Sequence, residues 1–142
     1  MEKVEDTLDV GVRINRIELL ASSLNSQLNP NSLLRNASFE VRIENSVNSE
    51  EKLIFVIVHT KITNEERTIV YGTLSVSCIF EIQGFEKAVR EAEGKVDINS
   101  QLRDSLNDSA ISTARGVMFS TFRGTFLHNA ILPLIEKNTD MW

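Results

Sequence analysis

The sequence has little of what disulfide-bonded, membrane-spanning and secreted proteins need. Its single cysteine, Cys78, cannot form a disulfide within the chain. No run of apolar residues approaches the roughly 18 to 20 that a membrane-spanning helix needs. The N-terminus is acidic and lacks the basic start of a secretory signal. We therefore expect a cytoplasmic protein that does not insert into membranes.

The residues that carry chemistry are also sparse. Only two histidines occur, His59 and His128, and neither has Cys, Asp or Glu ligands at the spacing of a metal site. No serine or threonine stands at a recognisable spacing from a base and an orienting acid, and the glycines form no phosphate-binding loop. With a net charge of −5 and no Lys/Arg cluster, the chain is also unsuited to nucleic acid. We expect no enzyme, no metal and no cofactor.

What remains is the composition of a globular domain. The 142 residues are 42% hydrophobic and 25% charged, which is enough to bury a core. We expect one domain over residues 1–142, with 1–9 as a flexible acidic N-terminus and 134–142 as a short C-terminal tail.

Four segments have the alternating pattern of β-strands. The first runs from about Val10 to Leu20, and its apolar phase slips near Asn15 and Arg16, which indicates a β-bulge. The other three cover residues 39–43, 53–58 and 70–82. The third is apolar on both faces, so its second face should also be covered. Cys78 falls in the alternation of the fourth strand, where a thiol acts as a small buried hydrophobe.

The connections between the strands are polar. Residues 22–36 form a long loop rich in Ser and Asn, and turns are expected at 45–51 and 63–67. The pair Glu65-Glu66 is most simply a solvated turn tip.

Helical patterns follow the strands. Residues 85–93 predict a short helix that ends at Gly94. A longer helix is expected to begin at cap residues 107–109 and to run to about Arg123, where Gly124 stops it. One arc of this helix is apolar and should pack on the sheet; it contains Ala110, Ile111, Ala114, Val117, Met118, Thr121 and Phe122. Phe119 lies outside the arc and, if exposed, marks a contact surface.

The C-terminal third resembles the end of the SecB export-chaperone family. Family members carry an Ala-Arg pair before a mostly apolar helix, an Arg-Gly-Thr-Phe turn and an apolar segment with a proline. Here these are Ala114-Arg115, residues 123–126 and residues 127–133. Residues 12–17 also resemble the first strand of the family, and residues 79–86 resemble its closing strand.

This resemblance implies an α+β fold: a four-stranded antiparallel sheet with a long crossover after the first strand, followed by a short and a long helix. It implies an ATP-independent holdase that binds unfolded polypeptides in apolar grooves and assembles as a dimer of dimers. The implied client-binding groove contains Leu24, Leu28, Leu33, Leu34, Phe39, Val41, Val117 and Phe119. The implied oligomer interface or structural motif contains Phe119, Arg123, Gly124, Thr125 and Phe126.

The chain departs from export-type members in two respects. These members contact the SecA motor through acidic residues on the outer sheet face, but the matching positions here are Ala21, Asn25 and Thr73, and the nearest carboxylate is Glu18. They also continue into a further helix and an acidic tail, whereas this sequence stops soon after Pro133. A role in export and a contact with SecA therefore stay open.

Three alternative functions stay open as well. One is a SecB-like chaperone dedicated to a single client such as an antitoxin, and another is a non-catalytic oligomeric adaptor. The third is a hotdog-type thioesterase, which also wraps a sheet around a long helix. In thioesterases of this type, however, the helix precedes most strands and an Asp or Glu on or near it is catalytic, whereas residues 109–123 carry no carboxylate.

Overall fold

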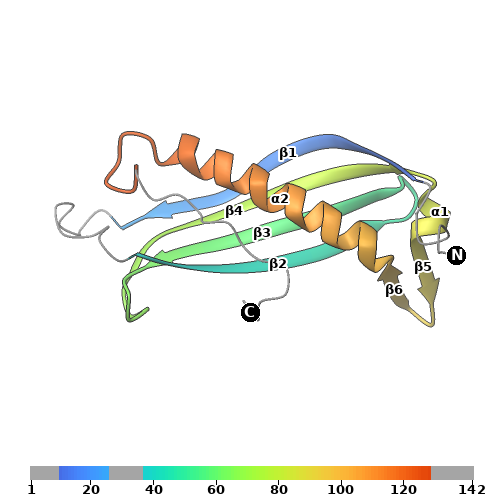
Figure 1. Ribbon diagram of the computed structural model, residues 1–142, viewed down its shortest axis with the longest axis horizontal. Helices are drawn as coiled ribbons and strands as arrows, with labels where there is room; N and C mark the ends of the chain where they lie inside the picture. The colour runs from blue at the N-terminus through green and yellow to red at the C-terminus, as the bar shows by residue number, and fades with distance from the viewer. Residues whose placement is uncertain (1–9, 26–36, 129–142) are drawn as a thin grey trace, which may run out of the picture.

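The computed structural model describes residues 10–25 and 37–128. The elements are β1 (Gly11–Leu24), β2 (Ser38–Asn48), β3 (Leu53–Thr63), β4 (Val70–Gln83), α1 (Phe85–Ala88), β5 (Val89–Ala92), β6 (Lys95–Ile98) and α2 (Ser100–Thr121). The first four strands form one antiparallel sheet in the order β1-β4-β3-β2, and β5 and β6 form a separate pair. Figure 1 shows α2 crossing one face of the large sheet diagonally, with the β5–β6 pair at one end. The predicted α+β class is confirmed.

The strand β1 contains the predicted bulge and a second one. Its register with β4 shifts between Ile14 and Arg16 and again between Leu19 and Ala21. Each shift leaves one extra residue in β1. The apolar residues on either side of each bulge therefore stay on the same face of the sheet, which explains the slip of phase in the sequence.

The core lies between the sheet and α2. Even-numbered residues of β3 and β4 alternate into it, and Ile54, Val56 and Val76 are fully buried. Cys78 is a free thiol in this layer, and its burial raises the pKa of the thiol, partly offset by a hydrogen bond with Thr113. The buried-core prediction for Cys78 is confirmed.

The strands extend further than the sequence pattern predicted. The strand β2 continues to Asn48, into the segment expected to be a turn, and β3 continues to Thr63. The ladder between them pairs every residue from Ser38↔Thr63 to Asn48↔Leu53. Cross-strand pairing therefore overrides the polar composition of residues 45–48.

The helix predicted over residues 85–93 is wrong beyond Ala88. The chain turns instead into a hairpin whose two-residue loop is Glu93-Gly94, with φ angles of 54° and 76°. Two positive φ angles are those of the type I′ turn that matches the twist of paired strands. Gly94 thus terminates a strand rather than a helix, and the hairpin buries Val89 and Ile98 against the core.

The helix α2 begins two turns before the predicted caps. Asn99 is the N-cap, and its side chain accepts a hydrogen bond from the Leu102 N–H at 3.0 Å. The early start extends the apolar face, because Leu102 and Leu106 are buried. The predicted caps at 107–109 lie inside the helix, which ends at Thr121 rather than at Arg123.

Candidate functional site

One sheet edge carries a row of exposed apolar side chains, which we call the β1 stripe. It consists of Val12, Ile14, Ile17, Leu19 and Leu24, which are 37–49% exposed. Their cross-strand partners on β4 are Ile82, Phe80, Cys78, Val76 and Gly72. Paired residues of an antiparallel ladder point to the same face, and the partners from Val76 to Ile82 belong to the core under α2. The stripe therefore lies on the helix-bearing face of the sheet.

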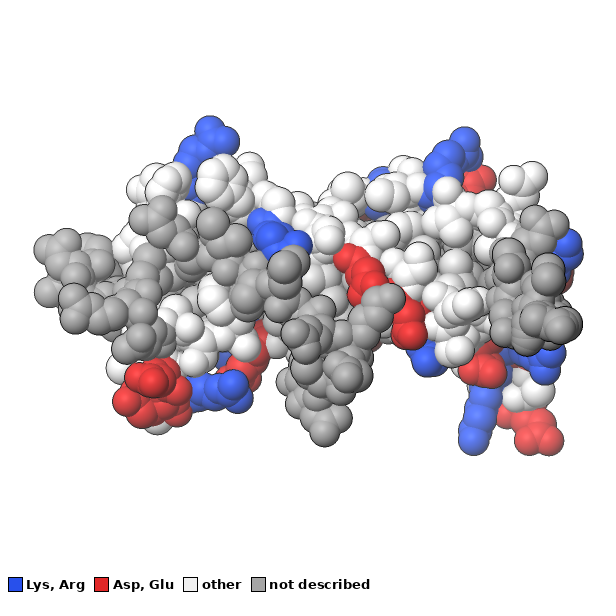
Figure 2. Space-filling view, viewed as in Figure 1, with Lys and Arg blue, Asp and Glu red and all other residues white. Residues whose placement is uncertain are grey.

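The position of β1 explains why this apolar face stays open. The strand is at the edge of the sheet, and α2 packs on the two central strands, β3 and β4. Every residue from Val12 to Leu24 is exposed. Figure 2 views this helix-bearing side, where uncharged side chains make up much of the described surface and charged ones also lie across its middle.

The predicted groove residues that the structure describes come from both edges of the sheet and from α2. Leu24 in β1 and Phe39 in β2 lie on opposite edges of the sheet. They are the two ends of one line of paired residues across the four strands, with Gly72 of β4 and Ile62 of β3 between them. Val41 is only 7% exposed and packs in the core, so it offers little surface to a client. Leu28, Leu33 and Leu34 lie outside the described residues.

The two predicted groove residues of α2 differ in exposure. Val117 is half-buried and packs against the core cluster. Phe119, which lies outside the apolar arc, is 45% exposed, and its ring centroid lies 5.9 Å from that of His128.

The Arg-Gly-Thr-Phe segment forms the turn after α2. Arg123 and Gly124 are exposed, while Thr125 and Phe126 are half-buried. The Thr125 hydroxyl donates to the Phe122 carbonyl at 2.7 Å and accepts from the Leu127 N–H at 3.1 Å. These bonds direct the fully buried Leu127 onto β4, where it packs against Gly72, a residue without a side chain. The turn thereby joins the C-terminal end of α2 to the sheet.

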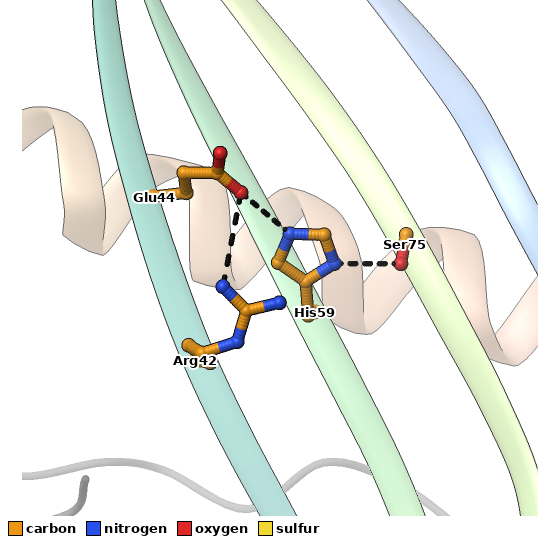
Figure 3. Close-up of polar contacts among 4 residues, drawn as sticks. All are labelled: Arg42, Glu44, His59 and Ser75. Atoms are coloured by element: carbon orange, nitrogen blue, oxygen red, sulfur yellow. Dashed lines mark hydrogen bonds and ion pairs between the residues drawn. The ribbon is translucent and has the colours of Figure 1, made fainter.

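The opposite face of the sheet carries a polar cluster that bridges three strands (Figure 3). His59 Nε2 lies 2.9 Å from Glu44 Oε1, and His59 Nδ1 lies 2.8 Å from Ser75 Oγ. Arg42 Nη1 is 3.8 Å from the same carboxylate oxygen. A cavity of about 460 Å³ lies beside these groups and is also lined by Lys61 and Arg67.

This cluster has the residue types of a hydrolytic triad but not its arrangement. In a triad the serine bonds to Nε2 and the carboxylate to Nδ1, whereas here the two nitrogens are exchanged. Ser75 also lies within β4, paired with Ala21 on one side and His59 on the other. Its backbone N–H is therefore committed to the ladder and is not free to stabilise an oxyanion. The arrangement fits cross-strand bridging better than catalysis.

Further polar contacts on this face involve side chains of β1. Arg13 Nη2 lies 2.6 Å from Glu81 Oε1, and hydrogen bonding to this guanidinium lowers the pKa of the carboxyl. Glu18 pairs with Arg16 at 2.9 Å. Thr73 shares a 2.6 Å hydrogen bond with Ser23.

The described part of the chain, residues 10–25 and 37–128, contains no group of three or more His, Cys, Asp or Glu side chains placed to hold a metal ion. Within the same ranges no helix is long and apolar enough to cross a membrane. The helix α2, which is longer than predicted, includes the exposed carboxylates Asp104 and Asp108, and it follows all four strands of the large sheet.

Comparison with known proteins identifies the fold. No protein-family profile and no curated protein sequence matches the chain. Among solved structures, the SecB-like chaperone Rv1957 of Mycobacterium tuberculosis, in complex with a ChAD peptide from the antitoxin HigA1, matches with a TM-score of 0.55. The match has 11% sequence identity and covers 87% of this chain and 90% of that one. This chain has a SecB-like fold.

A protein of unknown function from Streptococcus agalactiae matches with a TM-score of 0.44 and 11% identity, over 90% of this chain and 98% of that one.

Sequence reasoning did not identify the β1 stripe as an exposed surface. The alternation of Val12, Ile14, Ile17 and Leu19 was visible, but an apolar strand face looks the same whether or not a helix covers it. The exposure depends on which strands α2 covers, which strand alternation alone does not reveal.

Proposed function

We propose that this protein is an ATP-independent chaperone that holds non-native polypeptides on apolar surface and belongs among the SecB-like chaperones. The observation that carries the proposal is the β1 stripe, five apolar side chains left 37–49% exposed on one sheet face. Contiguous exposed apolar residues on one face indicate an interaction surface. The peptide-bound state of the structurally similar chaperone Rv1957 supports a polypeptide as the partner.

The energy available on one subunit is modest. Fully burying a Val-, Leu- or Ile-sized side chain contributes roughly 1.5 to 3 kcal/mol, and the stripe residues are about half buried already. Five such residues therefore supply a few kcal/mol, much of which ordering a flexible client offsets. A single subunit should bind weakly, and several subunits holding one long client gain affinity through effective concentration.

Assembly is accordingly part of the proposal. We infer a homo-oligomer, with a dimer of dimers as the expected form, in which the edge strand β1 and the solvent side of α2 near Phe119 meet copies of the same chain. Apolar surface that assembly does not cover remains for clients. Arg123, Gly124, Thr125 and Phe126 then act as the structural motif that sets the position of this end of α2.

A dedicated chaperone is the second candidate, because the matching structure holds a peptide from an antitoxin. Competition separates the two readings: unrelated unfolded proteins should displace one another from a general holdase, and should fail to displace the client of a dedicated chaperone or an adaptor. The outer-face positions Ala21 and Thr73 carry no charge, so we include no SecA contact in the proposal.

The direct test is suppression of aggregation. A chemically denatured model protein is diluted into buffer with and without this protein, in the absence of nucleotide, and light scattering is followed while the mass of the chaperone is measured in solution. We expect delayed scattering at near-stoichiometric chaperone and a mass above that of one chain. Unchanged scattering together with a monomeric mass would refute the proposal.

A further inference from the structure

The open edge of β2 presents the backbone groups of its odd-numbered residues. Along an antiparallel strand, successive residues direct their N–H and C=O groups alternately to the two sides. The Ile82 N–H donates to the Lys52 carbonyl at 3.1 Å. In this register, the even-numbered residues of β3 direct their backbone N–H and C=O groups toward β4, and the odd-numbered residues direct theirs toward β2. Because β2 pairs with β3 without a register shift, Asn45 and Val47 direct their backbone groups away from the sheet.

The strand β6 has an open edge of the same kind. The Asn99 N–H donates to the Ala88 carbonyl at 2.7 Å, which continues the register in which Asp97 pairs with Arg90. The odd-numbered residues of β6 therefore direct their backbone groups toward β5. By the same alternation, Val96 and Ile98 direct their N–H and C=O groups away from β5. No other described segment pairs with this edge or with the outer edge of β2.

These two edges border one cavity. It has a volume of about 430 Å³, and its lining residues are Asn45, Ser46, Val47, Val96, Asp97, Ile98 and Arg103. Three consecutive residues of β2 thus line it together with three consecutive residues of β6. Each strand contributes two residues whose backbone groups point outward.

The edge of β2 is also the more regular of the two edges of the large sheet. It runs for 11 residues without Pro, Gly or a register shift, whereas β1 is interrupted by two bulges. Bulges and prolines are devices that block edge pairing. The outward-directed Ile43 and Val47 have apolar side chains on the α2 side, and Arg42 and Glu44 lie on the opposite face.

Outward N–H and C=O groups in alternation are matched by the backbone of an extended chain. We propose that an extended segment of a non-native polypeptide adds to the open edge of β2 as a fifth strand and is held at this cavity between β2 and β6. Its alternate side chains would be apolar toward α2 and polar on the other face. This inference rests on the proposed chaperone function and names the surface and the backbone geometry by which a client is held.

Hydrogen exchange gives the first test. The full chain is measured at residue resolution with and without a reduced, carboxymethylated model protein that stays unfolded in buffer. We expect client-dependent slowing, by about tenfold or more, at the amides of Val47 and Val96. The amide of Ser46, already bonded to β3, is the internal control and should change less.

Proline variants give the second test, because proline removes an N–H that the sheet itself does not use. We compare Val47→Pro with Val47→Ala, and Val96→Pro with Val96→Ala, by client titration after confirming folding by circular dichroism. The loss of one or two hydrogen bonds predicts that each proline variant binds about three- to tenfold more weakly than its alanine partner.

The outcomes separate this inference from the proposed function. If the client binds normally, the edge amides stay unprotected and the proline and alanine variants have equal affinities, then the inference about the β2 edge is overturned and the proposed chaperone function stands. Protection of the same amides that rises with protein concentration in the absence of client assigns the edge to a second copy of this chain and also overturns the inference. No binding of any unfolded protein overturns both.

Discussion

At the scale of single residues, the contact between Gly72 and Leu127 joins the segment after α2 to the sheet. A Cβ added at Gly72 would lie 2.7 Å from Leu127 Cδ1 and 2.9 Å from the Ser23 carbonyl oxygen. The leucine end can move, but the carbonyl belongs to the backbone of β1. The absence of a side chain at this position is therefore required by the packing of two separate elements.

We predict that Gly72→Ala destabilises the fold by about 1 to 3 kcal/mol, the usual cost of overpacking. The matched control is Gly116→Ala in α2, where an added Cβ meets nothing within 4 Å. Because alanine is the better helix former, this control should stabilise the protein by about 0.5 to 1 kcal/mol. Urea unfolding measures both, and equal effects of the two substitutions would contradict the packing described for Gly72.

At the scale of elements, the segment between β4 and α2 shows how local signals compete. Residues 85–93 have helical composition, yet only Phe85–Ala88 is helical and the rest forms the β5–β6 hairpin. Burial of Val89 and Ile98 against the common core favours the paired strands. Asn99 then caps α2 directly after the hairpin, so that Leu102 and Leu106 reach the sheet.

We predict that Asn99→Ala lowers the free energy of unfolding by about 1 kcal/mol, because the N-cap bond to Leu102 is lost. Ser109→Ala is the control, since Ser109 lies exposed inside α2, where alanine is preferred. It should be neutral or stabilising by up to about 0.5 kcal/mol. Thermal unfolding measures the difference, and the opposite ranking would place the helix start at residues 107–109.

At the scale of the whole molecule, the β1 stripe and the ion pairs of β1 lie on opposite faces of the sheet. The helix-bearing side has the β1 stripe, whereas the opposite side has ion pairs and the His59 cluster. Exposed ion pairs contribute little net stability and are screened by salt, whereas apolar contacts persist at high ionic strength. Assembly through the helix-bearing side should therefore survive high salt.

We predict that Ile17→Asp lowers the solution mass and weakens client capture, because it introduces a charge into the apolar stripe. Ala21→Asp is the matched control on the same strand: Ala21 is exposed and pairs with Ser75, on the face opposite α2. Light scattering in low salt and in 1 M salt, together with the aggregation assay, measures both variants. Both variants are first checked for folding by circular dichroism, and equal losses in the two folded variants would show that neither assembly nor client capture depends on the stripe.

The sequence by itself determined the sheet strands, the buried thiol and the exposed aromatic, because these depend on alternation and on helical period. The run from Val70 to Ile82 predicts β4 within one residue at its end, and the phase slip at Asn15 marks the first bulge of β1. Phe119 is exposed because it lies outside the apolar arc of its own helix. Each of these properties belongs to one segment and its neighbours in sequence.

Only the tertiary structure decided which apolar faces remain open and where α2 begins. The order β1-β4-β3-β2 leaves β1 at an edge beyond the strands that α2 covers, so its apolar face is exposed, while Val41 on the other edge is buried. The hairpin in place of a helix brings the edge of β6 to the edge of β2. Burial and edge pairing depend on segments distant in sequence, and local periodicity carries no information about their positions.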